Sequence, residues 1–293
     1  MLADLVIRQR LSALAKALPA AAQGNPVAIH QARVATRRLR EALTLTRGRA
    51  SRNVRVAVRR LTRALGPIRE LDVTLDLVAR MVAEDRVSPE AATVVREAVR
   101  EERRHLTATL TRRLERCNVD KLRRKAIAAS HHRIDVRHGD PTRVADARYR
   151  AARRAQALRE AIEQAAAIYL PHRLHEVRIA LKKLRYGLEI VRELSRSRAQ
   201  VTLTRLKAAQ DLLGRMHDLE MLIARTRAVQ ASPRGPDLNV SAELDRFVRH
   251  VETECRRLHG HYIAMRQELL RICDRVVAAS EQPSRERRRT RAA

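Results

Sequence analysis

Residues 29–43 read IHQARVATRRLREAL, and residues 174–188 read LHEVRIALKKLRYGL. At an offset of 145 residues the two stretches agree at a histidine, at several basic positions and at leucines. A second pair of blocks follows in the same order, LTRALGPIRELDV at 61–73 and AAQDLLGRMHDLEM at 208–221, aligned on Gly66 and Gly214 at an offset of 148. Two ordered blocks that both recur predict a duplicated chain, built as two helical bundles related by a pseudo-two-fold axis.

The first block has two different faces when it is placed on a helix at about 100° per residue. One arc of about 80° contains a histidine and three arginines: His30, Arg33, Arg37 and Arg40. The opposite side is apolar and contains Ala32, Ala35, Leu39, Ala42 and Leu43. The second block repeats the pattern, with His175, Arg178, Lys182 and Arg185 opposed by Val177, Ala180, Leu184 and Leu188. Each helix is therefore expected to bury one face and to present a cationic face that carries a histidine.

Like charges three and four residues apart on a helix repel one another, unless an anion or a nearby carboxylate offsets the repulsion. A second stripe of this kind, made of Arg52, Arg55, Arg59 and Arg63, is expected on the helix over 52–65. In the other repeat Lys207 stands opposite Arg59, but Asp211 stands opposite Arg63, so the two halves are not equal. We interpret the stacked cations as a surface for a polyanion.

The charge balance points to the same kind of partner. The 293 residues contain 62 Lys and Arg against 33 Asp and Glu, a formal net charge of +29. Such an imbalance indicates a polyanionic partner. The hydrophobic fraction of 45% is enough for a core and excludes a disordered basic tail as the whole chain. Aromatic residues, at 2%, are too scarce for the base-stacking platforms of proteins that read single-stranded nucleic acid.

The chain is expected to be all-α, because apolar residues recur at three- and four-residue steps and no stretch alternates like a strand. Expected helices run over 2–18, 27–47, 52–65, 69–85, 89–117, 120–130, 142–169, 173–195, 199–213, 216–230 and 239–278. Ser88-Pro89-Glu90 has the form of a helix start, and Asp140-Pro141 marks a hinge. The repeats are then residues 1–118 and 140–279 of a single domain, followed by a basic disordered tail over 280–293.

Several classes of protein and site are disfavoured. No apolar run approaches the ~20 residues that span a bilayer, and the N-terminus does not read as a signal peptide. The three cysteines, Cys117, Cys255 and Cys273, are expected to be reduced and buried in a cytoplasmic protein. The acidic residues Glu70, Asp72, Asp76, Asp218 and Glu220 are expected in the first turns of their helices, where they interact with the helix N-terminus and pair with nearby arginines. A divalent metal shared with phosphate is the alternative. His131, His132 and His138 lack the spacing of a metal site, so neither a metal site nor a cofactor is expected.

The duplicated HxxRxxxRRLR pattern, with an LG…R(D/E)LD block after each copy, resembles the CHAD family, the conserved-histidine α-helical domain. The resemblance covers nearly the whole chain as a stand-alone module. It implies two helical bundles with basic helices lining a central groove or pore, non-catalytic binding of inorganic polyphosphate, and association with polyphosphate granules. The matching motif positions are His30, Arg33, Arg37, Arg38 and Arg40, then His175, Arg178, Lys182, Lys183 and Arg185.

We expect polyphosphate to meet these ten residues together with Arg55, Arg59, Arg63, Lys207 and His217. Lys182-Lys183 replaces an arginine pair and weakens the bidentate grip on phosphate expected there. His217 stands where the first repeat has Arg69. The alternative function is an architectural protein that binds DNA or RNA with the same charge, so nucleic acid is expected as a competitor. No enzymatic activity is expected, because phosphoanhydride cleavage usually needs a carboxylate-bound metal and the histidine helices carry cations instead.

Overall fold

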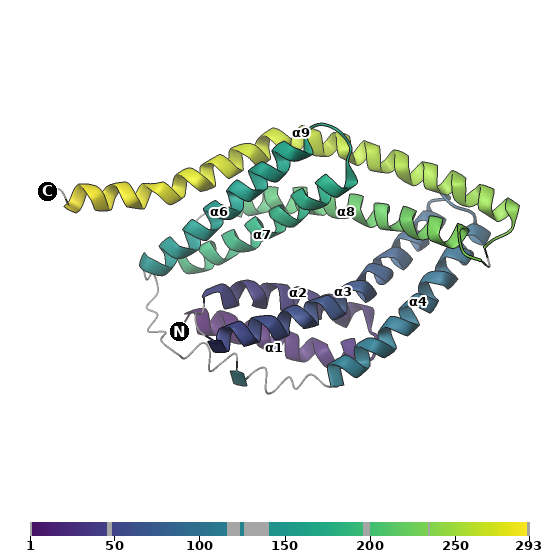
Figure 1. The fold of residues 1–293 in the computed structure, drawn as a ribbon, viewed down its shortest axis with the longest axis horizontal. Coiled ribbons are helices and arrows are strands. Elements are labelled where there is room, and N and C mark those ends of the chain that lie inside the picture. The colour runs from purple at the N-terminus through teal and green to yellow at the C-terminus, as the bar shows by residue number, and fades with distance from the viewer. Residues whose placement is uncertain are drawn as a thin grey trace. The chain divides into compact units, whose positions relative to one another are not determined.

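The computed structural model describes residues 2–45, 49–115, 124–125, 141–195, 200–233 and 235–291, and side chains within 7–44, 51–114, 124–125, 144–195, 200–233 and 235–280. All regular structure in these ranges is helical, which confirms the all-α class. The helices are α1 (Leu2–Ala22), α2 (Pro26–Ala42), the 3-10 turn η1 (Leu43–Leu45), α3 (Arg49–Ala83), α4 (Pro89–Glu115), α6 (Pro141–Ala165), α7 (Pro171–Ser195), α8 (Gln200–Gln230) and α9 (Leu238–Arg291) (Figure 1).

The chain divides into two compact units. Unit 1 contains α1 to α4 together with residues 218–254, and unit 2 contains α6, α7, α8 as far as His217, and α9 from Cys255. Helices α8 and α9 thus contribute to both units, so this division differs from the expected repeats 1–118 and 140–279. The pseudo-two-fold axis and the central basic groove stay predictions.

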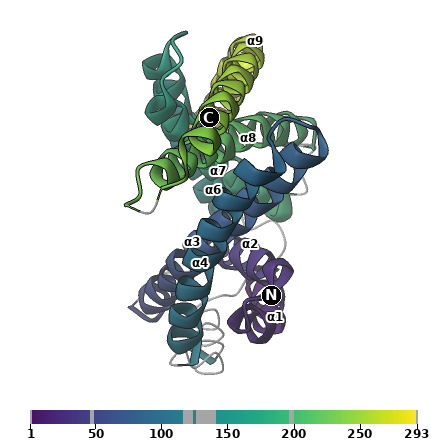
Figure 2. The ribbon, with the colours of Figure 1, turned by 90° about the vertical axis from the view of Figure 1, so that its right-hand side faces the viewer.

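Unit 1 is built around α2, which packs on α3, and α3 in turn packs on α4 (Figure 2). Its core is continuous across all four helices, with Ile7, Leu11 and Leu14 from α1, Ile29 and Leu39 from α2, Val58, Leu65 and Ile68 from α3, and Leu110 from α4. The predicted apolar face of the first histidine block, Ala32, Ala35, Leu39, Ala42 and Leu43, is entirely buried. That burial turns the opposite, basic face of α2 away from the core.

Unit 2 is organised by the hairpin of α6 and α7, which pack against each other along their length. Buried leucines and isoleucines from α6 (Leu158, Ile162) join those of α7 (Leu181, Leu184) and α8 (Leu206, Leu213). The predicted apolar positions of the second histidine block, Val177, Ala180, Leu184 and Leu188, are also buried. The duplicated pattern therefore has the same consequence in both units.

Side chains fix three of the helix starts. The Ala28 backbone N–H donates to Asn25 Oδ1 over 3.0 Å, one residue before the Pro26 that opens α2. The Ala91 N–H donates to Ser88 Oγ over 3.3 Å, which confirms the predicted start at Ser88-Pro89. The Val240 N–H donates to Asp237 Oδ1 over 2.9 Å at the start of α9. Each cap satisfies a backbone donor that has no partner within its helix.

The expected breaks near Gly66-Pro67 and after residue 213 are wrong, because α3 and α8 each continue through them. Pro67 is exposed while its neighbours Leu65 and Ile68 are buried in the core, so tertiary packing outweighs the ~3 kcal/mol that proline costs inside a helix. The backbone continues α9 to Arg291, and the disordered state expected for the tail over 280–293 stays a prediction.

Candidate functional site

The basic faces of α2 and α3 converge in unit 1. Burial lowers the pKa of Arg40 most, and the positive charges of Arg59, Arg37 and Arg63 lower this pKa further, whereas Glu41 acts in the opposite direction. Two arginines from each helix therefore lie close enough to repel one another. We call Arg37, Arg40, Arg59 and Arg63 the arginine cluster. Within the described part of the chain, Arg37, Arg59 and Arg63 form no ion pair with a carboxylate.

His30 lies about two turns before Arg37 of this cluster on α2. Burial is the largest cause that lowers the pKa of its imidazole, followed by the charges of Arg69, Arg33 and Arg37. Arg69 of α3 is thus a close electrostatic neighbour of His30, although we did not include it among the expected binding residues. The signal for it was present in the sequence, because Arg69 aligns with His217 in the other repeat.

Arg33 lies against α3. Its Nη2 is 3.8 Å from Glu70 Oε1, and its side chain is only 18% exposed. Its Nη1 lies 2.7 Å from where a Cβ on Gly66 would be, so the absence of a side chain at Gly66 makes room for the guanidinium. Arg33 therefore joins α2 to α3.

Two predicted residues stand apart from the cluster. Arg38 is exposed, and its carbonyl oxygen accepts a hydrogen bond of 2.8 Å from Arg10 Nη1 of α1. Arg55 is half-buried on α3. Neither is among the charges that shift the pKa of Arg40 or of His30.

In unit 2 the equivalent pair to His30 and Arg69 is His175 and His217. Their ring centroids are 4.8 Å apart, with the ring planes tilted by 46°. The structure therefore brings together the same two repeat positions in each unit, once as histidine and arginine and once as two histidines. Arg178 and Lys182 follow His175 on α7 and are half-buried.

Several cations of unit 2 have carboxylate partners. Arg185 Nη1 donates to Glu189 Oε1 over 2.5 Å, and its Nε donates to Gln210 Oε1 over 2.9 Å. Lys207 Nζ donates to Asp211 Oδ2 over 2.5 Å. The local positive charge at these two predicted residues is thus partly neutralised. Lys183 is elsewhere, on the side of α7 that faces α6.

The acidic residues of the first repeat pair with arginines, as expected, but their expected place in the first turn of a helix is wrong, because α3 begins at Arg49 and runs through them. Asp72 is buried and accepts a 2.7 Å hydrogen bond from Arg103 Nε, while its Oδ2 is enclosed by protein. Asp76 lies 3.8 Å from Arg69, and Glu70 lies 3.8 Å from Arg33. In the described ranges no three His, Cys, Asp or Glu side chains are grouped to hold a metal ion. The sequence motif did not reveal Arg103, which comes from a different helix.

The remaining expectations concern cysteines, membranes and the interdomain loop. Cys255 and Cys273 are buried free thiols, and burial raises the pKa of Cys273 to about 12. Cys117, His131, His132, His138 and the hinge residue Asp140 lie outside the described residues. In the helices described here, no segment is both long and apolar enough to cross a bilayer.

Comparisons with known proteins identify a family and similar folds. The family model described as "CHAD domain" matches residues 5–227. PptA from Streptomyces chartreusis has a similar fold, with a TM-score of 0.60 and 15% identity over 96% of this chain and 98% of that one. The CHAD domain from the plant Ricinus communis gives a TM-score of 0.58 and 20% identity over 96% of this chain and 90% of that one. The search among curated proteins finds no match.

Proposed function

The chain belongs to the CHAD domain family, and we propose that it binds inorganic polyphosphate without catalysing a reaction on it. The binding residues are the basic faces of α2 and α3 in unit 1 and those of α7 and α8 in unit 2. In this proposal the protein associates with polyphosphate granules through these residues.

The observation that carries the proposal is the arginine cluster. Arg37, Arg40, Arg59 and Arg63 come from two helices. Burial lowers the pKa of Arg40 most, and the positive charges of the other three arginines lower it further. Such an arrangement is unfavourable in the free protein. A bound polyanion converts the repulsion into attraction, and guanidinium groups donate two parallel hydrogen bonds to phosphate oxygens.

Polyphosphate suits this surface better than nucleic acid does. A chain of phosphates offers charge without bases, so it needs cations but no stacking platform. The protein has one Phe, four Tyr and no Trp; Phe247 and Tyr262 are buried, whereas Tyr149 is exposed, so few rings can stack on bases. Single-stranded nucleic acid binding generally depends on exposed aromatic rings.

The absence of catalysis is part of the proposal and rests on the acidic residues. Hydrolysis of a phosphoanhydride usually needs carboxylates that hold a metal beside the phosphate. Here Asp72 is buried against Arg103, and Glu70 and Asp76 lie beside arginines. Each of these carboxylates already lies beside a guanidinium, and this positive charge disfavours a metal ion there.

A competition experiment tests the proposal. Labelled polyphosphate is bound to the protein and chased with duplex DNA, single-stranded RNA or unlabelled polyphosphate at equal phosphate concentration. We expect polyphosphate to displace the label at much lower concentration than either nucleic acid. Equal or better displacement by nucleic acid would support the architectural alternative instead.

The chemical fate of the ligand is measured in the same samples. Chain length and released phosphate are followed with Mg²⁺ or Mn²⁺ added and with both omitted. We expect full-length polyphosphate to be recovered in all cases. Shortening that depends on the protein would overturn the non-catalytic part of the proposal and leave the binding part standing.

A further inference from the structure

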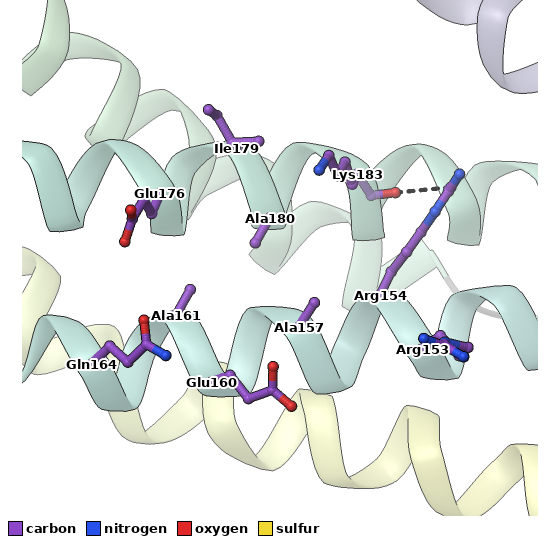
Figure 3. Close-up of a pocket in the computed structure, with 10 residues that line it drawn as sticks. All are labelled: Arg153, Arg154, Ala157, Glu160, Ala161, Gln164, Glu176, Ile179, Ala180 and Lys183. Carbon is purple, nitrogen blue, oxygen red and sulfur yellow. Dashed lines mark hydrogen bonds between the residues drawn. The ribbon is translucent and has the colours of Figure 1, made fainter.

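A groove of about 500 Å³ runs between α6 and α7 in unit 2, on the side of α7 that carries Lys183 (Figure 3). It is separate from the stripe of His175, Arg178, Lys182 and Arg185. Its α6 wall includes Arg153, Ala157 and Glu160, and its α7 wall includes Glu176, Ile179 and Lys183.

The charges of the groove are divided between its two ends. Figure 3 shows Arg153, Arg154 and Lys183 towards one end and Glu176 and Gln164 towards the other, with Glu160 between Ala157 and Gln164. On each helix the cation and the carboxylate are seven residues apart, Arg153 to Glu160 on α6 and Glu176 to Lys183 on α7. Seven residues are two helical turns, about 10 Å along the axis, so the two charges share one face.

The middle of the groove is apolar and shallow. Small side chains of Ala157, Ala161 and Ala180 form its floor, and Ile179 stands beside them with 40% of its surface exposed. Tyr149, one turn before Arg153 on α6, is 60% exposed.

The cations of the groove differ in whether they already contact another residue of the protein. Arg154 extends across the groove and its Nη1 donates to the Lys183 carbonyl oxygen over 3.1 Å, which ties α6 to α7 (Figure 3). Arg153 and Lys183 are exposed and form no ion pair with any described residue. Glu176 accepts a 3.1 Å hydrogen bond from Arg173, and Glu160 accepts one of 3.1 Å from Gln156. Both carboxylates keep an exposed side chain.

We propose that this groove is the interface of a homodimer, in which it docks on the same groove of a second copy. The two-fold axis lies in the plane of the interface, perpendicular to the two helices, and passes close to Ala157 on α6 and Ile179 on α7. Rotation about this axis reverses the direction of each helix and places the cationic end of one copy over the acidic end of the other. Arg153 then faces Glu160 of the partner subunit, and Lys183 faces Glu176 of the partner subunit.

The charge pattern favours a second copy over other occupants. On each helix a positive and a negative side chain lie at equal distances on either side of the midpoint. A two-fold rotation about that midpoint therefore places each positive charge opposite a negative charge of the other copy. Such self-complementarity is the requirement of an isologous interface. Polyphosphate would be attracted at one end and repelled at the other. The small alanine side chains let the two helix pairs approach closely, and Ile179, next to the axis, meets Ile179 of the partner subunit.

The large net charge opposes any association of two copies, and this makes the test decisive. At physiological ionic strength the Debye length is about 8 Å, which screens the overall repulsion but leaves ion pairs in contact. Changing one groove cation to glutamate lowers the net charge by two. General repulsion therefore predicts tighter association for such a variant, whereas the proposed interface predicts weaker association.

The experiment is sedimentation equilibrium on the full chain at 0.15 M salt, after nuclease treatment and a high-salt wash to remove polyanions that could bridge copies. We expect a monomer–dimer equilibrium. Arg153→Glu should raise the dimer dissociation constant about tenfold or more, because each dimer loses two pairs and gains two repulsions. Arg153→Glu combined with Glu160→Arg should restore it to near the wild-type value.

Arg271→Glu on α9 is the matched control, since Arg271 is exposed, lies in the same unit and changes the net charge equally. It should leave the dissociation constant unchanged or lower it. Ile179→Asp should weaken the dimer without changing the pattern of paired charges. A monomeric wild type, an Arg153→Glu variant that dimerises as well as Arg271→Glu, or a double variant that fails to recover would each overturn the proposed interface. Circular dichroism of every variant separates loss of association from loss of fold.

Discussion

Arg103 of α4 donates one hydrogen bond to Asp72 of α3 over 2.7 Å and another to the Gly24 carbonyl oxygen over 2.6 Å. The Arg103 guanidinium, on α4, thus links Asp72 on α3 to Gly24, which follows the end of α1. Asp72 is 3% exposed and Arg103 is 20% exposed, so this ion pair is shielded from water. These two hydrogen bonds of Arg103 hold α1, α3 and α4 together.

Asp72→Asn should lower the free energy of unfolding by about 3 kcal/mol, because it leaves Arg103 as a buried, unpaired charge. The matched control is Asp76→Asn, which removes an exposed carboxylate 3.8 Å from Arg69 and should cost less than about 1 kcal/mol. Urea denaturation of both variants gives the comparison. Equal losses for the two would show that the Asp72–Arg103 pair contributes no more than a surface contact.

Much of the fold follows directly from the sequence. The apolar positions of both histidine blocks are buried as predicted, and the start of α4 lies at Ser88-Pro89. Local periodicity and capping determine these features, and both can be read within one helix. The errors occur where packing from distant residues outweighs a local preference, as at Pro67, which remains helical because Leu65 and Ile68 are held in the core.

The sequence predicts which helix faces carry the cations of the candidate site, but not all the contacts that each side chain makes. The sequence placed Arg37, Arg40, Arg59 and Arg63 on stripes, and the structure brings these two stripes together. The i,i+4 spacing of Arg185 and Glu189 on α7 could have indicated their ion pair. The sequence could not show that Arg185 also donates to Gln210, because the packing of α7 against α8 decides that contact. The place of Lys183 in the α6–α7 groove depends on the same packing.

The two repeat-equivalent glycines should respond differently to alanine. A Cβ on Gly66 would lie 2.7 Å from Arg33 Nη1, whereas a Cβ on Gly214 would meet nothing within 4 Å. Inside a helix alanine is favoured over glycine by about 1 kcal/mol. Gly214→Ala should therefore stabilise the protein by about that amount. Gly66→Ala should gain less, because Arg33 must move away from Glu70.

Thermal unfolding of the two alanine variants measures this difference. A gain for Gly66→Ala as large as that for Gly214→Ala would mean that Arg33 relocates at no cost. The position of Arg33 also affects the charge presented by α2, so Gly66→Ala should weaken polyphosphate binding while Gly214→Ala should not.

The two halves should contribute unequally to polyphosphate affinity. Arg63 has no carboxylate partner among the described residues, whereas Lys207 is paired with Asp211 at 2.5 Å. Arg63→Ala and Arg37→Ala should each weaken binding by about 1–3 kcal/mol, the scale of charge-assisted hydrogen bonds. Lys207→Ala should cost less, because part of its charge is already neutralised. Isothermal titration with polyphosphate of defined length provides the values.

The same arginine variants should not destabilise the free protein. Removing one member of the arginine cluster relieves repulsion within it, so the melting temperature should stay level or rise. A lower melting temperature for Arg63→Ala would show that this arginine supports the fold. Its effect on binding would then be indirect.

Binding should weaken steeply with salt and should not need a metal. Each phosphate that is neutralised by Arg or Lys releases a counterion, so the logarithm of the affinity falls linearly with the logarithm of the salt concentration. Arg37→Ala should make this slope less steep than in the wild type. A flat salt profile, or a strict requirement for Mg²⁺, would contradict binding by several cations acting together.

Affinity should also depend on pH through the histidines. Burial and the charges of Arg69, Arg33 and Arg37 lower the pKa of His30 from its ordinary value of 6.5, so the free protein holds this imidazole neutral at pH 7. Bound polyphosphate reverses the local field and favours the imidazolium. By linkage, binding takes up protons, and the affinity should rise as the pH falls from about 8 to 6.

The sign for stability is opposite to the sign for binding. Because the pKa of His30 is lower in the folded protein than in the unfolded chain, stability from this group is present above the ordinary pKa and is lost as the pH falls towards the folded value.

In the double variant His30→Gln with His175→Gln, the rise in polyphosphate affinity at low pH should be much reduced, while Arg37 and Arg63 still bind. If the double variant keeps both the affinity and the full pH slope, the histidines serve the packing of the helices and the arginines alone contact polyphosphate.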